Sequence, residues 1–417
     1  MKRLLLVTYH FPPEPVAGAV RPGYLARYLS EFGWEVTVLT RPLGDPGFSC
    51  DLVTAGMPTA GFEARVRESF QSRGKSEHSR VRSALRHVKE MLLVPDRTVP
   101  WVPGAIRAGL DLTAKRHFDA MISTALPPSV HIVGGAIARA RNIPWIADYR
   151  DPWAGNYYAG RGPVRSAIER VLERTLITRA ESLTTISQPI ADQLRALHRR
   201  TDVHVIPNAY DPAEWSDLSD VTPSRFSLCF TGNMYDGKKR SPELLFAALA
   251  ALKTRGDAAA SAQVDFYGQA SEFIGACAER FGISDRVQQH GTVPRADAMR
   301  AQREAAVLLI FLATERRTLH EMGSKFLEYL GARRPIIAFG PRESVMRPYI
   351  EQHNIGWFAS DLGQAQDALR EAYARYSARN YQVEIDEATA PTARRLAERF
   401  AAVLDDTPVP ERALVTV

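Results

Sequence analysis

The segment from Gly323 to Phe339, Gly-Ser-Lys-Phe-Leu-Glu-Tyr-Leu-Gly-Ala-Arg-Arg-Pro-Ile-Ile-Ala-Phe, most constrains the fold of this 417-residue chain. It predicts a helix that begins at Gly323-Ser324, followed by a turn and a short apolar strand from Pro335 to Phe339. An apolar strand of this kind fits a parallel sheet that is covered on both faces. The segment therefore predicts an α/β protein in which a helix begins beside a buried strand.

The polar face of this predicted helix carries charge close to its N-terminal end. The unpaired backbone N–H groups of a helix N-terminus attract an anion, and Lys325 adds a full positive charge there. Glu321, Lys325 and Glu328 would share one helix face because they are spaced four and three residues apart. An ordinary solvated ion-pair face is the alternative interpretation of this triplet.

The rest of the chain also alternates apolar strands with amphipathic segments. Leu4 to Thr8 predicts a strand, residues 19 to 32 a helix and Val36 to Leu39 a second strand, which together form a β-α-β unit. The polar stretch that follows Pro207 is typical of a linker. A chain of this length suits two α/β domains of roughly 200 residues each. We predict a first domain over residues 1–208, a linker over residues 209–224 and a second domain over residues 225–388.

A loop rich in proline, from His10 to Gly18, follows the first predicted strand. A glycine at the start of the next helix lets backbone N–H groups approach a phosphate. The loop contains no G-x-G-x-x-G dinucleotide fingerprint, and close packing is the alternative explanation for Gly18.

Charged residues end a later strand of the same half. The apolar segment that begins at Ile143 runs into Asp148, Arg150 and Asp151. The C-terminal ends of strands in an open α/β sheet face the ligand crevice, so these charges lie where a ligand would bind. An Asp/Arg ion pair that ties down a loop is the alternative.

The C-terminal half opens with a strand that leads into Gly232-Asn-Met-Tyr-Asp-Gly-Lys-Lys. This spacing matches the G-x-x-x-x-G-K phosphate loop of ATPases. However, Lys239 stands where a magnesium-binding Ser or Thr is required, and no suitable Walker-B aspartate follows. The pattern argues against an NTPase and leaves Lys238 as a basic residue for a diphosphate.

A basic segment interrupts the first predicted domain. Residues 63–90 hold eight Lys or Arg against four Glu, and apolar residues recur at helical spacing at Val81, Leu85, Val88 and Leu92. They predict a helical insertion over about 63–95 that lies on an anionic membrane surface or guides an acidic acceptor. A solvated charged face is the alternative.

The three cysteines indicate a cellular compartment rather than a site. Cys50, Cys229 and Cys277 are far apart in the sequence, which fits neither a disulfide framework nor a zinc cluster and suits a reducing cytoplasm. No run reaches the roughly 18 apolar residues that span a bilayer. The net charge of +6 is modest for this length.

The stretch from Lys325 to Ala338 resembles the donor-binding signature of retaining glycosyltransferases of family 4, of the bacterial envelope and polysaccharide type. The Asp-x-Arg-Asp-Pro-Trp segment from Asp148 is similar to sequences of the same family. The resemblance implies the GT-B fold, an α/β architecture of two doubly wound Rossmann-like domains that face a central cleft. It also implies that the last segment, residues 389–417, carries a helix that crosses back to the N-terminal domain.

The resemblance assigns roles to individual residues. The glutamate at the place of Glu328 holds the ribose hydroxyls of a nucleotide sugar. The family's first paired glutamate would fall on His320, so its role in contacting the donor sugar passes to Glu321, to Lys325 or to backbone N–H groups around Gly323. The predicted donor-binding residues are Gly18, Gly232, Asn233, Lys238, Gly323, Ser324, Lys325 and Glu328. The predicted catalytic residues are Asp148, Lys238, Glu321 and Lys325. The acceptor-side candidates are His10, His131, Arg150 and Asp151.

These residues predict a glycosyltransferase that moves a sugar from a nucleotide-sugar donor, with a UDP-sugar favoured, to a hydroxyl of a lipid-linked or saccharide acceptor. Positive charges and helix ends would stabilise the leaving diphosphate, so we expect no metal and no other cofactor. We expect a cytoplasmic protein that contacts the inner face of the membrane through residues 63–90 and binds no nucleic acid. A sugar-nucleotide epimerase of the same fold and a non-catalytic nucleotide-sugar-binding protein remain the alternatives.

Overall fold

The computed structural model describes residues 1–14, 16–56, 93–156, 162–218, 221–234, 240–313 and 322–407. The predicted basic segment 63–90, Lys238 and Glu321 lie outside these residues. The chain divides into two compact units. The first unit comprises Met1–Asn208 together with Ala393–Val417, and the second comprises Ala209–Thr392.

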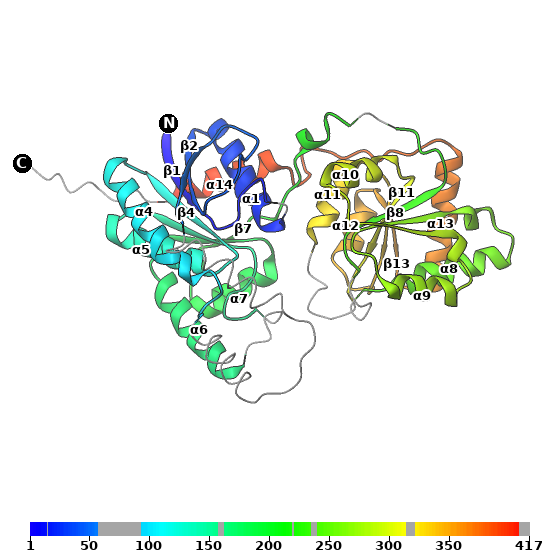
Figure 1. Ribbon diagram of the computed structural model, residues 1–417, viewed down its shortest axis with the longest axis horizontal. Helices are drawn as coiled ribbons and strands as arrows, with labels where there is room; N and C mark the ends of the chain where they lie inside the picture. Colours follow the sequence, from blue (N-terminus) through cyan, green and yellow to red (C-terminus); the bar gives the residue numbers. More distant parts are fainter. Residues whose placement is uncertain are drawn as a thin grey trace, which may run out of the picture. The chain divides into compact units, whose positions relative to one another are not determined.

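The first unit is built on a sheet of seven parallel strands in the order β3-β2-β1-β4-β5-β6-β7 (Figure 1). The strands are β1 (Lys2–Val7), β2 (Trp34–Thr40), β3 (Asp51–Thr54), β4 (Ala120–Ala125), β5 (Trp145–Tyr149), β6 (Ser182–Thr185) and β7 (Val203–Val205). The helices are α1 (Ala17–Tyr28), α4 (Val102–Lys115), α5 (Ser129–Arg141), α6 (Pro163–Ile177), α7 (Gln188–His198) and α14 (Ala393–Asp406). The strand order changes direction between β1 and β4, which makes this pair the switch point where such sheets bind ligands.

The central strands of this sheet are apolar on both faces. Leu4, Leu5, Leu6 and Val7 of β1 are fully buried, as a strand covered by helices on either side requires. The helix predicted over residues 19 to 32 forms α1 and a short 3₁₀ turn, Leu29–Phe32, and it stops at Gly33, whose φ of 84° favours glycine.

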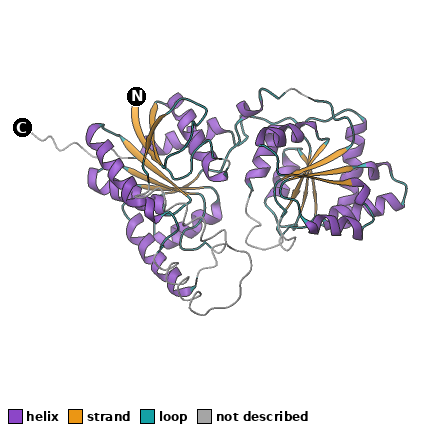
Figure 2. Cartoon of the chain, in the orientation of Figure 1, coloured by secondary structure: helices purple, strands orange, loops and turns teal. Residues whose placement is uncertain are grey.

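The second unit contains a six-stranded parallel sheet in the order β10-β9-β8-β11-β12-β13. Its strands are β8 (Ser227–Thr231), β9 (Gln263–Tyr267), β10 (Val287–Gly291), β11 (Val307–Phe311), β12 (Ile336–Phe339) and β13 (Gly356–Ala359). Its helices are α8 (Glu243–Thr254), α9 (Glu272–Arg280), α10 (Arg295–Glu304), α11 (Ser324–Ala332), α12 (Met346–Gln352) and α13 (Leu362–Ser377). Figure 2 shows helices on both faces of each sheet. The switch point here lies between β8 and β11. The predicted architecture of two doubly wound α/β domains is confirmed.

The last described helix, α14, belongs to the first unit although it follows the second in sequence. It packs on α1, which lies beside it in Figure 1. The guanidinium of Arg21 lies 4.9 Å from the centre of the Phe400 ring, and Lys2 Nζ lies 2.7 Å from Asp405 Oδ1. In the second unit, Tyr210 and Thr392 form a parallel bridge, so the two segments that leave this unit run side by side. None of the helices in the described residues is both long and apolar enough to cross a bilayer.

Candidate functional site

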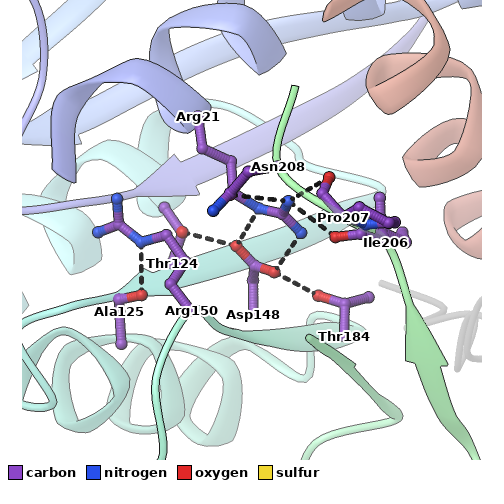
Figure 3. A network of polar contacts seen from close by, with 9 residues as sticks. All are labelled: Arg21, Thr124, Ala125, Asp148, Arg150, Thr184, Ile206, Pro207 and Asn208. Carbon is purple, nitrogen blue, oxygen red and sulfur yellow. Dashed lines mark hydrogen bonds and ion pairs between the residues drawn. The ribbon is translucent and has the colours of Figure 1, made fainter. Parts of the chain in front are cut away.

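The switch point of the first unit is occupied by a buried ion pair between α1 and β5 (Figure 3). Arg21 Nε and Nη2 donate to the two carboxylate oxygens of Asp148 at 3.0 and 2.9 Å. The hydroxyls of Thr124 and Thr184, on β4 and β6, donate to the same carboxylate at 2.7 Å each. Asp148 is fully buried and accepts four hydrogen bonds. It therefore connects three strands and a helix.

The electrostatics of this pair favour a charged carboxylate. Burial alone would raise the pKa of Asp148, but the Arg21 charge and the hydrogen bonds from Arg21, Thr124 and Thr184 hold that pKa below its ordinary value. Arg21 Nη1 also donates to the carbonyl oxygens of Ile206 and Pro207 at 2.9 and 3.0 Å. The catalytic role predicted for Asp148 is corrected on this ground, because its acceptor positions are filled and it cannot reach a substrate. The alternative of an Asp/Arg ion pair holds, with Arg21 rather than Arg150 as the partner.

Three of the predicted residues do meet at the C-terminal ends of β1, β4 and β5. Arg150 is buried and donates to the carbonyl oxygens of Ala125 and of Gly18, the second through a short contact. A Cβ atom on Gly18 would lie 3.3 Å from His10 Cδ2, so the two residues are in close contact. Burial, followed by the charges of Arg150 and Arg41, lowers the pKa of His10 to about 4. His10 is only partly exposed and its imidazole is neutral near pH 7, which suits it to bind a hydroxyl through a hydrogen bond rather than to take its proton.

The other two acceptor-side candidates differ in access. Asp151 is half-buried just after β5. His131 is fully buried, with Nδ1 2.8 Å from Ser123 Oγ and its ring 4.7 Å from that of Tyr149. Burial is the main cause that lowers its pKa, to about 3. His131 is therefore a neutral core residue, and the acceptor-side role predicted for it is corrected.

The switch point of the second unit is built around Gly232, which directly follows β8. Its φ of 126° favours glycine, and a Cβ atom there would lie 2.2 Å from Lys325 Nζ. The Lys325 ammonium thus lies directly over the backbone at the end of β8, 5.1 Å from the centre of the Phe230 ring. Asn233 Oδ1 accepts a hydrogen bond from the backbone N–H of Gln269 at 2.8 Å, which joins the ends of β8 and β9.

Lys325 lies in the first turn of α11, where several sources of positive potential meet. The helix begins at the exposed residues Gly323 and Ser324, and no side chain in the described part of the chain caps it. Its first N–H groups have no acceptor within the helix. Burial lowers the pKa of Lys325, the Glu328 charge opposes that shift and the Arg240 charge adds to it. An anion bound here would favour the charged form of Lys325 and would also meet the helix N-terminus.

Glu328, one turn further along α11, is held by a residue that sequence reasoning missed. Gln302 of α10 is fully buried, and its Nε2 donates to Glu328 Oε1 at 2.6 Å and to Thr231 Oγ1 at 2.9 Å. The backbone N–H of Thr231 donates to the hydroxyl of Tyr329 at 3.0 Å. These bonds fix α10 and α11 against the end of β8.

Glu328 keeps capacity for further hydrogen bonds. Its side chain is half-buried, and it makes no ion pair with any described residue, so the alternative of an ion-pair face is not supported for it. A carboxylate with one oxygen anchored and its other lone pairs open can accept two neighbouring hydroxyls. Gln302 follows buried Met299 by three residues, so it lies on the buried face of α10, and an uncharged polar residue on that face is the sequence signal that could have identified it.

The predicted site residues therefore form two groups, one in each unit. The group in the second unit consists of Gly232, Asn233, Gly323, Ser324, Lys325 and Glu328. The group in the first unit consists of His10, Gly18 and Arg150. Where the structure is described, no group of three or more His, Cys, Asp or Glu side chains is arranged to hold a metal ion.

Comparison with known proteins agrees with this arrangement. Residues 17–209 match the family described as glycosyl transferase 4-like domain. Sequence comparison with curated proteins gives no match.

Several solved structures share the fold over nearly the whole chain. They include the sucrose-phosphate synthase (tll1590) from Thermosynechococcus elongatus, with 16% identity and a TM-score of 0.54 over 97% of this chain and 95% of that one. Anabaena Alr3699/HepE, solved in complex with UDP and glucose, has 11% identity and a TM-score of 0.57 over 97% of this chain and 100% of its own. WaaG, a glycosyltransferase involved in lipopolysaccharide biosynthesis, has 14% identity and a TM-score of 0.54 with the same coverage. At these identities the likeness shows a common fold.

Proposed function

Because residues 17–209 match the glycosyl transferase 4-like domain and the whole chain has the GT-B fold, we propose that the protein is a glycosyltransferase that transfers a sugar from a UDP-sugar to a hydroxyl acceptor with retention of configuration. The observation that carries the proposal is the group at the end of β8. There Lys325 covers Gly232, and Gln302 orients the open carboxylate of Glu328. A cation beside a helix N-terminus suits a diphosphate, and a carboxylate one turn away suits the two hydroxyls of a ribose.

The donor is proposed from the chemistry of this group together with the fold. Glu328 would accept hydrogen bonds from both ribose hydroxyls, while Lys325 and the N–H groups of Gly323 and Ser324 would hold the diphosphate. Gly232 and Asn233 would let the phosphates approach the backbone at the end of β8. The fold neighbour from Anabaena was solved with UDP and glucose, which supports uracil as the base of the donor nucleotide.

In the proposed reaction the bond between the anomeric carbon and the diphosphate oxygen breaks, and a bond from the acceptor oxygen to the same carbon forms on the same face of the sugar. The acceptor's proton passes to the leaving diphosphate. Lys325 and the N-terminus of α11 stabilise the negative charge that develops on that group, which is electrostatic stabilisation of the transition state. Lys238 and Glu321, outside the described residues, are proposed to act at the diphosphate and the donor sugar.

The acceptor side is proposed to lie in the first unit, at His10, Gly18, Arg150 and Asp151. The neutral imidazole of His10 can bind a hydroxyl, and buried Arg150 holds the first turn of α1, which carries Gly18, in place. The fold neighbour WaaG is involved in lipopolysaccharide biosynthesis, which supports a lipid-linked or saccharide acceptor of surface glycan synthesis. We place the enzyme in the cytoplasm, with residues 63–90 at the inner face of the membrane.

Donor binding and turnover are tested separately. Calorimetry should detect UDP binding in the presence and absence of EDTA, because the proposed diphosphate contacts are basic groups and helix ends. Loss of binding in EDTA would contradict metal independence. A radiolabelled UDP-sugar, incubated with a bacterial lipid extract and with free saccharides, should yield a labelled glycoside and UDP. Release of an epimerised nucleotide sugar, or binding without turnover of any acceptor, would contradict the glycosyl transfer.

A further inference from the structure

Helix α6 of the first unit exposes three large aliphatic side chains to solvent. Val164, Ile168 and Val171 have relative exposures of 64%, 46% and 66%. They are spaced four and three residues apart, so they lie on one face of the helix. No other helix in the described part of the chain exposes three large hydrophobic side chains. The stripe therefore takes no part in the core formed by the described residues of the unit.

Both acidic residues of α6 point away from this stripe. Glu169 and Glu173 are fully buried. Arg165 Nε donates to Glu169 at 2.8 Å, and the backbone N–H of Ala154 donates to Glu173 at 2.9 Å. With 3.6 residues per turn, Glu173 lies opposite Val164. The outer face of α6 consequently carries no carboxylate of its own.

The exposed charges that α6 itself carries beside the stripe are positive. Arg170 and Arg174 are exposed and lie along one flank of the stripe, and exposed Arg179 follows the end of the helix. Arg174 Nε donates to the carbonyl oxygen of Leu197 at 2.9 Å. Within the described residues, none of these three arginines forms an ion pair.

We propose that this α6 face, defined by Val164, Ile168 and Val171 with Arg170, Arg174 and the following Arg179, docks on an anionic phospholipid surface. Helices that lie in a membrane interface bury an apolar stripe between the acyl chains and place basic residues among the phosphates. The α6 face has both parts, and its acidic residues are turned inward. The inference rests on the proposed function only in its purpose, which is to bring the enzyme to a lipid-linked acceptor.

Hydrogen bonds hold the start of α6 in place. Arg165 Nη2 donates to the carbonyl oxygens of Leu93 and Pro95 at 3.3 and 2.9 Å. The helix that carries the stripe is therefore anchored at its first turn.

The test is flotation of the full-length protein with phosphatidylcholine vesicles, with and without phosphatidylglycerol. We expect binding to the anionic vesicles only, and a fall in binding as salt rises, because attraction between exposed charges is screened within about 8 Å at physiological ionic strength. The triple variant V164S/I168S/V171S should lower the apparent vesicle affinity at least about tenfold, because the strength of membrane binding scales with the apolar area that the helix buries in the bilayer. R170Q/R179Q should lower it by a smaller factor.

Matched variants separate this surface from general effects of the substitutions. Leu362→Ser removes an aliphatic residue of 44% exposure from α13 in the second unit, and Arg107→Gln removes an exposed arginine of α4. Both should leave vesicle binding unchanged. UDP affinity should be the same in all of these variants. If the proposed donor is wrong, the parent protein will fail to bind UDP, whereas the flotation result will not change. Absence of vesicle binding, binding that survives the triple substitution, or a parent dimer that the triple variant converts to a monomer would each overturn the proposal.

Discussion

The two switch points of this molecule use similar residues for different purposes. In the first unit, Asp148 is fully buried and accepts four hydrogen bonds, two of them from Arg21. In the second, Glu328 is half-buried and accepts one hydrogen bond from the residues that the structure describes, that of Gln302. Both carboxylates lie near strand ends where α/β sheets bind ligands. The two carboxylates differ in how many further hydrogen bonds each can accept.

This difference teaches how to distinguish a structural carboxylate from a ligand-binding one at equivalent places. A buried charge needs a full set of partners, because its desolvation is otherwise uncompensated. A binding carboxylate needs one fixed oxygen and a second side that remains open to hydroxyl donors. The comparison predicts opposite responses to the same chemical change, loss of a negative charge, at the two positions.

The largest effect should follow Asp148→Asn. The substitution leaves Arg21 buried without a negative partner, which should lower the free energy of unfolding by about 3–5 kcal/mol. Urea unfolding measures this change. UDP affinity of the folded variant should match the parent. The matched control is Glu31→Gln, which breaks the exposed pair of Glu31 and Arg394 and should change stability little.

The same carboxylate gives a pH dependence with a definite sign. The pKa of Asp148 is lower in the folded chain than its ordinary value, so the pair stabilises the fold above that ordinary value. This contribution should disappear as the pH falls below about 4. The Asp148→Asn variant should lose less stability than the parent over the same acid range, and an equal loss in both would remove Asp148 from the explanation.

The next effect is expected from Glu328→Gln. The change keeps an oxygen that can accept from Gln302 but removes the charge that would bind the ribose. UDP affinity should fall about ten- to a hundredfold, since hydrogen bonds to a charged group contribute roughly 1.5–3 kcal/mol. Calorimetry gives the affinity, and the melting temperature should stay the same. Exposed Glu279→Gln is the control, and a stability loss with unchanged affinity would make Glu328 a second structural carboxylate.

A smaller effect should follow Gln302→Leu, which removes the donor that orients Glu328. Affinity for UDP should fall about two- to tenfold, because a typical hydrogen bond contributes roughly 0.5–1.5 kcal/mol. In the double variant Gln302→Leu/Glu328→Gln, the loss of UDP affinity should be smaller than the sum of the two single losses, because Gln302 acts on the nucleotide only through Glu328. Additive losses would show that Gln302 does not position Glu328.

The smallest effect concerns pH and Lys325. Burial lowers the pKa of this lysine, so it should lose its charge, and UDP affinity should begin to fall, at a lower pH than for an ordinary lysine. Titration of UDP affinity between about pH 7 and 10 shows this fall. Lys325→Arg should move it to higher pH because a guanidinium stays charged. The same midpoint in both proteins would assign the titration to another group.

The sequence predicted the two sheets and the neighbourhood of Lys325 and Glu328, because these follow from local periodicity and helix spacing. It did not predict the partners. Arg21 lies 127 positions from Asp148, and nothing local states that the two meet. The spacing of Arg21 from Tyr24 and Leu25 on the apolar face of α1 was the available signal, since a charge on that face needs a buried partner. Asp148 and His131 were assigned to function because sequence shows residue type but not access.

The position of α14 has a consequence for the order in which the chain can assemble during synthesis. Domains generally form as their residues become available. Every strand and helix of the second unit lies within residues 209–392, whereas the first unit needs α14, whose Phe400 packs against Arg21. The unit that is translated first is therefore completed last. Until then, the surface of α1 that α14 will cover remains open to solvent and to chaperones.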